Sequence, residues 1–542
     1  MPIRKRLVVA SACLVVLAVS GAAPGAALFT ASSATSVVQP HGTRGVPVAG
    51  ALARPRATPG PLSAPQLAAM HGPLPQDPVA YASAKARADS LAPGRAAPNA
   101  PSSTSQQPAT LRTWQGIDPT LTPSDSHGAI GSDRYVEIVN AQYAIYDRTD
   151  NAPLAQGTIN SMAGASASDS VFDPQVIWDP TTARFYYSMV DVASSTSNVL
   201  AVGYSKTSTP AGPADWCHTF IDYGAETPDY PKIGDSVNLV VIGVNVFPLA
   251  GAPRSDITAL FKPPAGTGCV AMSGATQKDV RNADNSVAWT PMPANDVEGN
   301  ASNYTLANRS DGANFISVFQ VVNYGGILFL GPRTVSVPAY SMPADVPQPA
   351  PAPHPLDTLD GRFWTAVEVI DPARGPNALA LWTAHTVFGG AGAQVRWYEI
   401  KPEATPPVLY QSGVQTSTSV FVFNDAIAPD RRVLGNDRRY GDSMVLGFNT
   451  GSSTQPVDVE MIAKSGANAP SAPVVVKTST GPISDGACND AEHPGVCRWG
   501  DYSGASPDPA SDAGQAHGVV WFTNSFAANT HSHSWNWSAR PK

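Results

Sequence analysis

Residues that could bind a ligand or carry out catalysis recur at the starts of strand-like stretches in this 542-residue chain. Carboxylates and hydroxyls gathered in one place could bind a sugar, or a Ca²⁺ ion through their oxygens. Two carboxylates could hydrolyse a glycosidic bond, and a Tyr or His base beside an Arg could cleave a uronic sugar as a lyase does. We predict a ligand-binding site formed by Asp125, His127, Asp173, Asp229, Tyr230, Asp360, Arg362, Asp425, Asp501 and Tyr502.

The alternative for each of these residues, and for Asn424 beside them, is a structural role: capping a turn or bridging two strands. We assign no catalytic residue. No cofactor is expected, apart from a structural Ca²⁺ ion that such oxygens could hold.

Three further groups have chemistry that the sequence leaves open. His385 could act as a general base, although a packed histidine is the commoner case. Ser236 and Ser443 follow Gly-Asp pairs, as in some serine-hydrolase loops, but the expected strand turns lack the elbow that activates such a serine. His531 and His533 would share one face of a strand. They could begin a metal site, but no third ligand is evident, so a solvent-facing edge is favoured.

Short strands are the elements that must position these residues. Runs rich in Val, Ile, Tyr, Phe and Trp alternate with Gly, Pro, Asp and Asn from about residue 110 onward, as in 134–147, 183–192, 238–247, 378–387 and 518–526. This pattern is typical of strands, and no long stretch has the helical period. We therefore expect one all-β domain over residues 110–542.

The strand starts repeat along the chain. Equivalent positions are His127, Asp173, Tyr230, Pro293, Leu359, Asn424 and Trp499, and successive ones lie 46 to 75 residues apart. Seven units of this size, each with room for four short strands, predict a seven-bladed β-propeller. Because the fourth unit is faint, six or eight blades stay open. Residues 110–116 could supply the strand that joins the first and last blades.

The chain resembles a family of secreted bacterial β-propeller proteins with sialidase-like architecture, most of them without an assigned activity. The stretches that carry the resemblance are "SDSHGAIGSDRYVEIVNAQYAIYDR", "FDPQVIWDPTTARFYY", "DYPKIG", "LDTLDGRFWTAV", "LWTAHTV", "VRWYEI" and "RWGDYSGASPDP". The resemblance implies the propeller fold and an extracellular location, and it implies no reaction. The Ser-x-Asp-x-Gly-x-x-Trp repeat of true sialidases is absent.

The N-terminal part is expected to precede the folded domain. Residues 1–27 combine Arg4, Lys5 and Arg6 with a short apolar run and small residues, which predicts a signal peptide. Residues 28–109 are rich in Ala, Pro, Ser and Thr and poor in large apolar residues, so we expect a disordered leader. One piece of it, "DPVAYASAKARADSLA", could form a helix.

The cysteines indicate the redox compartment of the protein, and its net charge indicates which classes of partner are excluded. Without the signal peptide the chain has four cysteines, Cys217, Cys269, Cys488 and Cys497, which an oxidising compartment would pair. Three pairings are open; Cys488 with Cys497 would close a small loop, and Cys217 with Cys269 would join neighbouring units. A net charge of −8 without a basic block argues against nucleic-acid binding.

The sequence thus favours a secreted, monomeric propeller that binds a glycan or an extracellular protein at the mouth of its central channel. No membrane span is expected once the signal is removed. The alternative is a carbohydrate-active enzyme (a glycoside hydrolase, sialidase-like, or a polysaccharide lyase) with its site over the channel.

Overall fold

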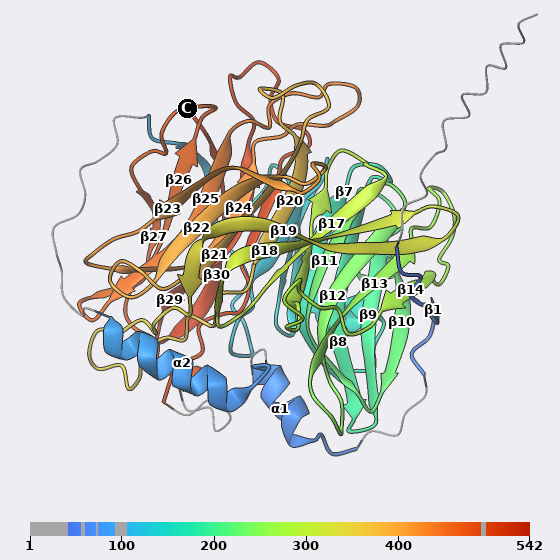
Figure 1. Ribbon diagram of the computed structural model, residues 1–542, viewed down its shortest axis with the longest axis horizontal. Coiled ribbons are helices and arrows are strands. Elements are labelled where there is room, and N and C mark those ends of the chain that lie inside the picture. The colour runs from blue at the N-terminus through green and yellow to red at the C-terminus, as the bar shows by residue number, and fades with distance from the viewer. Residues whose placement is uncertain (1–41, 56–59, 72–73, 93–105, 489–494) are drawn as a thin grey trace, which may run out of the picture. The chain divides into compact units, whose positions relative to one another are not determined.

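The computed structural model describes residues 42–55, 60–71, 74–92, 106–488 and 495–542, which belong to one compact unit (Figure 1). Seven antiparallel sheets follow one another around a central axis and form a β-propeller. The predicted seven blades are therefore confirmed. The predicted signal peptide, residues 1–27, lies outside the described residues. No helix in the described ranges is long and apolar enough to cross a membrane.

Each blade begins at the axis and adds strands outward. The first blade contains β3 (His127–Ile130), β4 (Arg134–Val139), β5 (Gln142–Asp147) and β6 (Pro153–Thr158). The second contains β7 (Ser170–Asp179), β8 (Arg184–Ser194), β9 (Ser197–Ser205) and β10 (Trp216–Gly224). The third contains β11 (Thr227–Asp235), β12 (Leu239–Phe247), β13 (Arg254–Phe261) and β14 (Ser273–Gln277). A short helix, α3 (Ile159–Ala163), connects the first blade to the second.

The remaining blades follow the same plan. The fourth blade contains β15 (Trp289–Pro293), β17 (Ser302–Asn308), β18 (Gly312–Asn323) and β19 (Ile327–Ser341), and the fifth contains β20 (Thr365–Ile370), β21 (Leu379–Val387), β22 (Gln394–Lys401) and β23 (Val408–Gln415). The sixth contains β24 (Phe421–Pro429), β25 (Met444–Ser452), β26 (Gln455–Lys464) and β27 (Val474–Thr478). The seventh contains β28 (Gly504–Pro507), β29 (Val520–Ala528) and β30 (His531–Arg540). The short β16 (Asn295–Asp296) pairs in parallel with β20 of the fifth blade.

The hydrophobic core lies between neighbouring blades. Val136 of the first blade packs in one buried cluster with Val176 and Phe185 of the second blade. Further clusters join the other neighbouring blades around the ring, including the seventh with the first. Burial of one such side chain contributes about 1.5–3 kcal/mol, so each sheet depends on its neighbours for stability.

The strand β2 (Ala109–Gln115) closes the ring. It pairs antiparallel with β30, so the seventh blade combines three strands from the C-terminal end with one from far earlier in the chain. Trp114 of β2 then packs edge-on against Tyr135 of the first blade and Trp521 of the last. The proposed joining role of residues 110–116 is confirmed.

Part of the segment before β2 is also folded, which differs from the expected disordered leader over 28–109. Within that range, β1 (Val46–Ala49) extends the third blade by pairing with β14. The helix α1 (Ala64–His71) contacts β7 and β11, and α2 (Pro78–Leu91) begins at the N-cap Asp77 (Figure 1). The composition indicated disorder because these elements have little apolar surface of their own; they are held by contacts with the propeller.

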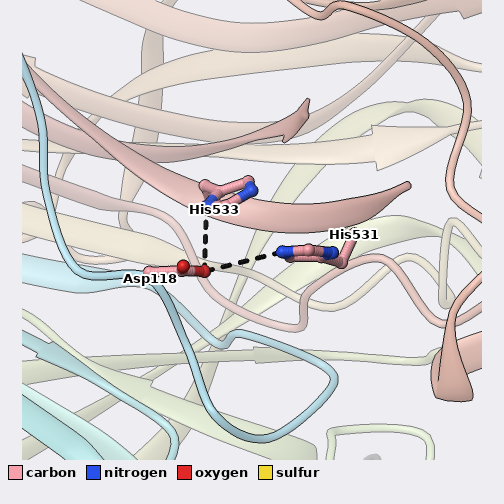
Figure 2. A group of neighbouring side chains, drawn as sticks. All are labelled: Asp118, His531 and His533. Atoms are coloured by element: carbon pink, nitrogen blue, oxygen red, sulfur yellow. Dashed lines mark ion pairs between the residues drawn. The ribbon is translucent and has the colours of Figure 1, made fainter. Parts of the chain in front are cut away.

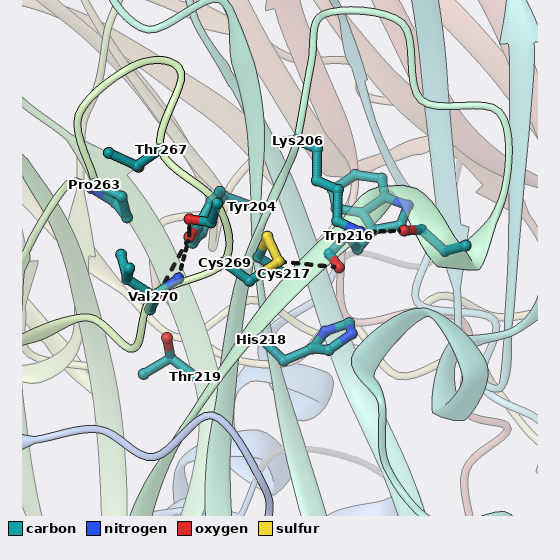
Figure 3. The surroundings of a disulfide bond; sticks show 12 residues. Tyr204, Lys206, Trp216, Cys217, His218, Thr219, Pro263, Thr267, Cys269 and Val270 are labelled. Carbon is teal, nitrogen blue, oxygen red and sulfur yellow. Dashed lines mark hydrogen bonds between the residues drawn. A yellow bond between two sulfur atoms is a disulfide. The ribbon is translucent and has the colours of Figure 1, made fainter.

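Two disulfides join the four cysteines in the predicted pairs. Cys217 of β10 bonds Cys269, which lies between β13 and β14, and so links the second blade to the third (Figure 3). Beside it, the Tyr204 hydroxyl accepts a hydrogen bond from Val270 N at 3.0 Å. Cys488 and Cys497 are separated by nine positions. These disulfides are compatible with an oxidising compartment.

Replacing Cys217 and Cys269 together by Ser should lower the free energy of unfolding by about 2–4 kcal/mol, since the bond closes a long loop of the unfolded chain. The same replacement at Cys488 and Cys497 is the matched control and should cost less, because that loop is short. Chemical denaturation measures both. Equal losses would contradict a loop-length effect.

Candidate functional site

Most of the predicted ligand-binding residues converge at one end of the central channel, but none of them is open to solvent. All ten are buried, and the most exposed, His127, shows 7% of its surface. Eight of them lie within one network of hydrogen bonds, ring contacts and charge interactions, which we call the axial cluster: Asp125, Asp173, Asp229, Tyr230, Asp360, Arg362, Asp501 and Tyr502. The other two, His127 and Asp425, lie apart from it.

A chain of hydrogen bonds runs through the axial cluster from the seventh blade to the third. The Asp501 N–H donates to Asp125 Oδ1 at 2.8 Å, and the Asp173 N–H donates to Asn140 Oδ1 at 3.0 Å. Asp173 Oδ2 in turn accepts from the Tyr230 N–H at 3.1 Å. The Tyr230 hydroxyl closes the path by donating to the backbone oxygen of Asp501. Part of the expected structural role, the bridging of blades, is therefore present.

Left-handed backbone at the inner strands aims these groups. Residues with φ between 45° and 54° stand at the same place in five blades: Asp125, Asp173, Tyr230, Thr290 and Asn424. Asp and Asn tolerate this conformation, whereas Tyr and Thr adopt it only under constraint. In four of the five blades the strand bulges there, and the N–H groups of residues 173, 230 and 290 each reach an oxygen of the preceding blade.

Of the basic residues of this site, sequence reasoning found Arg362 but missed Lys232 and Arg498. Lys232 Nζ lies beside both the Tyr230 and the Tyr502 ring, 3.9 and 3.8 Å from their centroids. Burial, followed by the nearby Arg362, holds the pKa of Lys232 well below its usual value. Arg498 pairs with Asp501 and with Asp357. Lys232 could have been found because it is two residues from Tyr230 on the same strand.

Several polar atoms of the axial cluster, and of Lys232, which contacts its two Tyr rings, are buried without a hydrogen-bond partner among the described residues. The donors are Lys232 Nζ, Arg362 Nη1 and the Tyr502 hydroxyl, and the acceptors are Asp229 Oδ1 and Asp501 Oδ2. Leaving such groups unpaired costs about 1–3 kcal/mol each, and more when they are charged. A cluster of this kind is suited to a ligand rich in both donors and acceptors.

Residues 74–92 cover the axial cluster. The Leu74 N–H donates to Asp229 Oδ2 at 3.0 Å. From α2, Lys85 Nζ contacts Asp345 Oδ1 and the Thr358 hydroxyl, both at 2.7 Å. In α2 only Lys85 and Ala88 are buried, so the helix buries little apolar surface against the propeller.

Two hollows border α2, and the channel itself is closed farther in. One, of about 290 Å³, lies between the start of α2 and the fourth blade, with Tyr81, Arg281 and Arg309 on its wall. The other, of about 510 Å³, runs along α2 toward Phe388. Inside the channel, a cavity of about 20 Å³ beside His127 has room for about one water molecule. A ligand would therefore enter from the α2 side.

Burial dominates the protonation of the carboxyl groups. It raises the pKa of Asp229 to about 8, and it raises the pKa of Asp125 and Asp173 well above the usual range, with nearby carboxylates adding to the effect. Burial lowers the pKa of His127 to about 3, and Lys232 contributes to the same shift. At neutral pH the Asp229 carboxyl is therefore mostly protonated, and the His127 imidazole, outside the axial cluster, is neutral.

Asp425 and His385 have structural partners elsewhere in the inner strands. Asp425 Oδ2 accepts from the Thr386 hydroxyl at 2.9 Å, so its side chain is engaged away from the axial cluster. His385 is fully buried, with Nδ1 at 2.8 Å from Gly361 O and Nε2 at 3.0 Å from the Tyr398 hydroxyl. Burial lowers its pKa to about 3, so it is a packed neutral histidine.

Ser443 and His517 do not form the arrangement of a serine hydrolase. His517 Nδ1 lies 3.3 Å from the Ser443 hydroxyl and 3.4 Å from Asp430 Oδ2. A catalytic histidine accepts from the serine with one nitrogen and donates to the carboxylate with the other. Here one nitrogen faces both groups, so this contact does not activate the serine.

His531 and His533 are not a bare solvent-facing edge. Asp118, which follows the ring-closing strand, lies beside both of them. No local pattern around His531 and His533 indicates this third residue, because it is more than 400 positions away. Its placement depends on the pairing of β2 with β30.

The sequence matches no protein-family model, and comparison with curated proteins gave no match. Among solved structures, a Trypanosoma rangeli sialidase in complex with sialic acid is 10% identical with a TM-score of 0.36, over 69% of this chain and 54% of the sialidase chain. The chain thus spans about half the length of that sialidase. At this identity and TM-score the similarity gives no indication of function.

Two further solved propeller-like structures have similar scores. Drosophila Semaphorin 1b, extracellular domains 1-2, is 7% identical with a TM-score of 0.37, over 81% of this chain and 88% of that one. An exo-β-1,3-galactanase from Phanerochaete chrysosporium with galactose is 12% identical with a TM-score of 0.28, over 69% and 95%.

The raised pKa of Asp229 predicts a pH dependence of stability. Because the folded protein holds this proton more tightly than the unfolded chain, its contribution to stability is complete below about pH 4 and is lost as the pH rises toward 8. The slope for one such group approaches about 1.4 kcal/mol per pH unit. Urea denaturation at pH 5 and pH 8 should show a smaller loss in Asp229→Asn than in the wild type. An identical loss in both would contradict the assignment.

Proposed function

We propose that this protein is an exported β-propeller binding module that recognises a glycan through the axial cluster, and that residues 74–92 regulate access to it. The observation that carries the proposal is the set of buried, unpartnered donors and acceptors around the axis, represented by Lys232 Nζ, Arg362 Nη1 and Asp229 Oδ1. A binding site for a small polar ligand needs such convergent groups in a concave, mostly dry setting.

A sugar fits this chemistry better than an apolar ligand does. Hydroxyl groups both donate and accept, so one sugar ring could satisfy the cationic and carboxyl groups together. The Tyr230 and Tyr502 rings, with centroids 4.6 Å apart, supply flat apolar surface beside the polar atoms. The Arg362 guanidinium would suit a sugar that carries a carboxylate.

The covering segment supports a gated site. In α2, Lys85 contributes the main polar contact with the propeller, through Asp345 and Thr358. Because α2 buries little apolar area, its release costs less than the unfolding of a blade. A ligand that binds only the uncovered form has a lower apparent affinity, because only the fraction of molecules with α2 released can bind it.

Export and a bacterial source are part of this proposal. Export is supported by the predicted signal peptide and by two disulfides that an oxidising compartment would maintain, and the bacterial source rests on the sequence resemblance alone. The ligand class and the monomeric state are likewise predictions.

One observation favours the enzymatic alternative. Asp229 has a pKa of about 8 and a buried Oδ1 without a described partner, so it is a carboxylic acid at neutral pH. That is the state of the general acid in glycoside hydrolysis. New reducing ends from a polysaccharide, lost in Asp229→Asn, would support this alternative.

The test of the binding proposal opens the cover in the full chain. Lys85→Ala removes the contacts with Asp345 and Thr358, and Arg87→Ala, on the exposed face of α2, is the matched control. On a glycan array, Lys85→Ala should bind at least about tenfold more tightly than the wild type, since apparent affinity scales with the open fraction. Arg87→Ala should behave as the wild type does.

A second variant separates the site from its cover. Adding Lys232→Gln to Lys85→Ala should abolish the gained binding, because Lys232 lies inside the axial cluster. Hydrogen exchange of α2 verifies that Lys85→Ala releases the helix. If the helix is released and no glycan binds, the proposal is wrong.

A further inference from the structure

The ring closure brings an aspartate and two histidines together on the surface of the seventh blade. Asp118 follows β2, and His531 and His533 stand on the same face of β30 (Figure 2). Asp118 Oδ1 lies 3.0 Å from His533 Nδ1 and 3.7 Å from His531 Nε2. In the described part of the chain, this is the one group of three His, Cys, Asp or Glu residues whose ligand atoms all lie within 4.8 Å of one another.

We propose that Asp118, His531 and His533 form a binding site for a divalent transition-metal ion, with Zn²⁺ as the best match. Two imidazole nitrogens and one carboxylate oxygen are a usual ligand set for Zn²⁺, and a water molecule or another ligand takes the fourth place. Bonds of about 2.0–2.1 Å to such an ion are compatible with atoms 3.0 and 3.7 Å apart.

The hydrogen bonding of His533 favours a metal over a simple contact. Its Nε2 lies 3.0 Å from the backbone oxygen of Ala528, which can only accept, so Nε2 carries a proton. In the neutral ring Nδ1 then has a free lone pair, and it points at the Asp118 carboxylate, which also offers a lone pair. A cation bound between His533 Nδ1 and the Asp118 carboxylate would remove the repulsion between these two acceptors. A backbone oxygen that accepts from the other ring nitrogen is a usual hydrogen-bond partner of a metal-bound histidine.

The backbone on both sides of the site is fixed before any ion binds. Ser534, next to His533, donates from its N–H and its hydroxyl to the oxygen of Ile117, next to Asp118, at 3.3 and 2.9 Å. The Gly116 N–H donates to Ser534 O at 3.1 Å. These bonds hold the carboxylate-bearing loop against β30, so binding requires little reordering of the chain.

Exposure differs across the site in a way that leaves it accessible. The His533 side chain is 3% exposed, whereas those of His531 and Asp118 are 36% and 65% exposed. An ion can therefore enter from solvent and keep an open coordination position on the outer side. Once bound, it would join the segment after β2 to β30 and so strengthen the closure of the ring.

Metal binding by the full chain tests the proposal. After EDTA treatment and its removal, titration with ZnCl₂ followed by calorimetry should give one ion per chain, and Zn²⁺ should raise the melting temperature. Asp118→Asn and His531→Ala change exposed side chains, so both should fold. Each should weaken Zn²⁺ binding at least about tenfold and remove most of the thermal shift, since losing even an outer-shell partner costs 10–100-fold.

His517→Ala is the matched control, because His517 also lies beside an aspartate, Asp430, but the described residues offer no third ligand there. It should bind Zn²⁺ as the wild type does. No saturable uptake by the wild type would overturn the proposal and leave an ion pair between His533 and Asp118. Unchanged affinity in Asp118→Asn would also overturn it, since the two histidines alone would then be the chelate. Neither result depends on glycan binding.

Discussion

The pairing of β2 with β30 is the constraint on which the rest of the structure depends. A propeller sheet exposes two apolar faces, and each face is covered only if the ring has no gap. The seventh blade supplies three strands from one end of the chain and takes its fourth from residues 109–115. Trp114 then fills the seam between the last and first blades, where it contacts Tyr135 and Trp521.

Closing the ring also concentrates charge on the axis. Because the inner strands of all blades lie around one axis, the polar groups at their starts lie close together in a small volume. Part of this charge is neutralised within the protein: Arg362 pairs with Asp360 at 2.7 Å, and Arg498 pairs with Asp501. Two polar atoms beside these pairs, Lys232 Nζ and Asp229 Oδ1, have no hydrogen-bond partner among the described residues.

The fold was predictable because repetition is visible in the sequence, whereas the surroundings of the site were not. Strand starts such as His127, Asp173 and Tyr230 share a local pattern, and the left-handed backbone at Asp173 explains why an Asp is suited to that position. The burial of these residues was missed because the cover comes from a segment whose composition, poor in large apolar residues, indicated disorder. Asp118 was missed because only the three-dimensional pairing of distant strands brings it to His533.

The origin of the closing strand has a consequence for synthesis. Trp114 and Ala109 of β2 are synthesised long before Asn536 and Arg540, the residues of β30 with which they pair. The early blades can fold as they emerge, yet β2 and the exposed flank of the first blade stay unmatched until β30 is synthesised, when translation is nearly finished. During that interval the nascent chain has an unpaired strand edge and an uncovered apolar face. A neighbouring chain could supply the missing strand in place of its own, so crowded production of this protein favours swapped pairs.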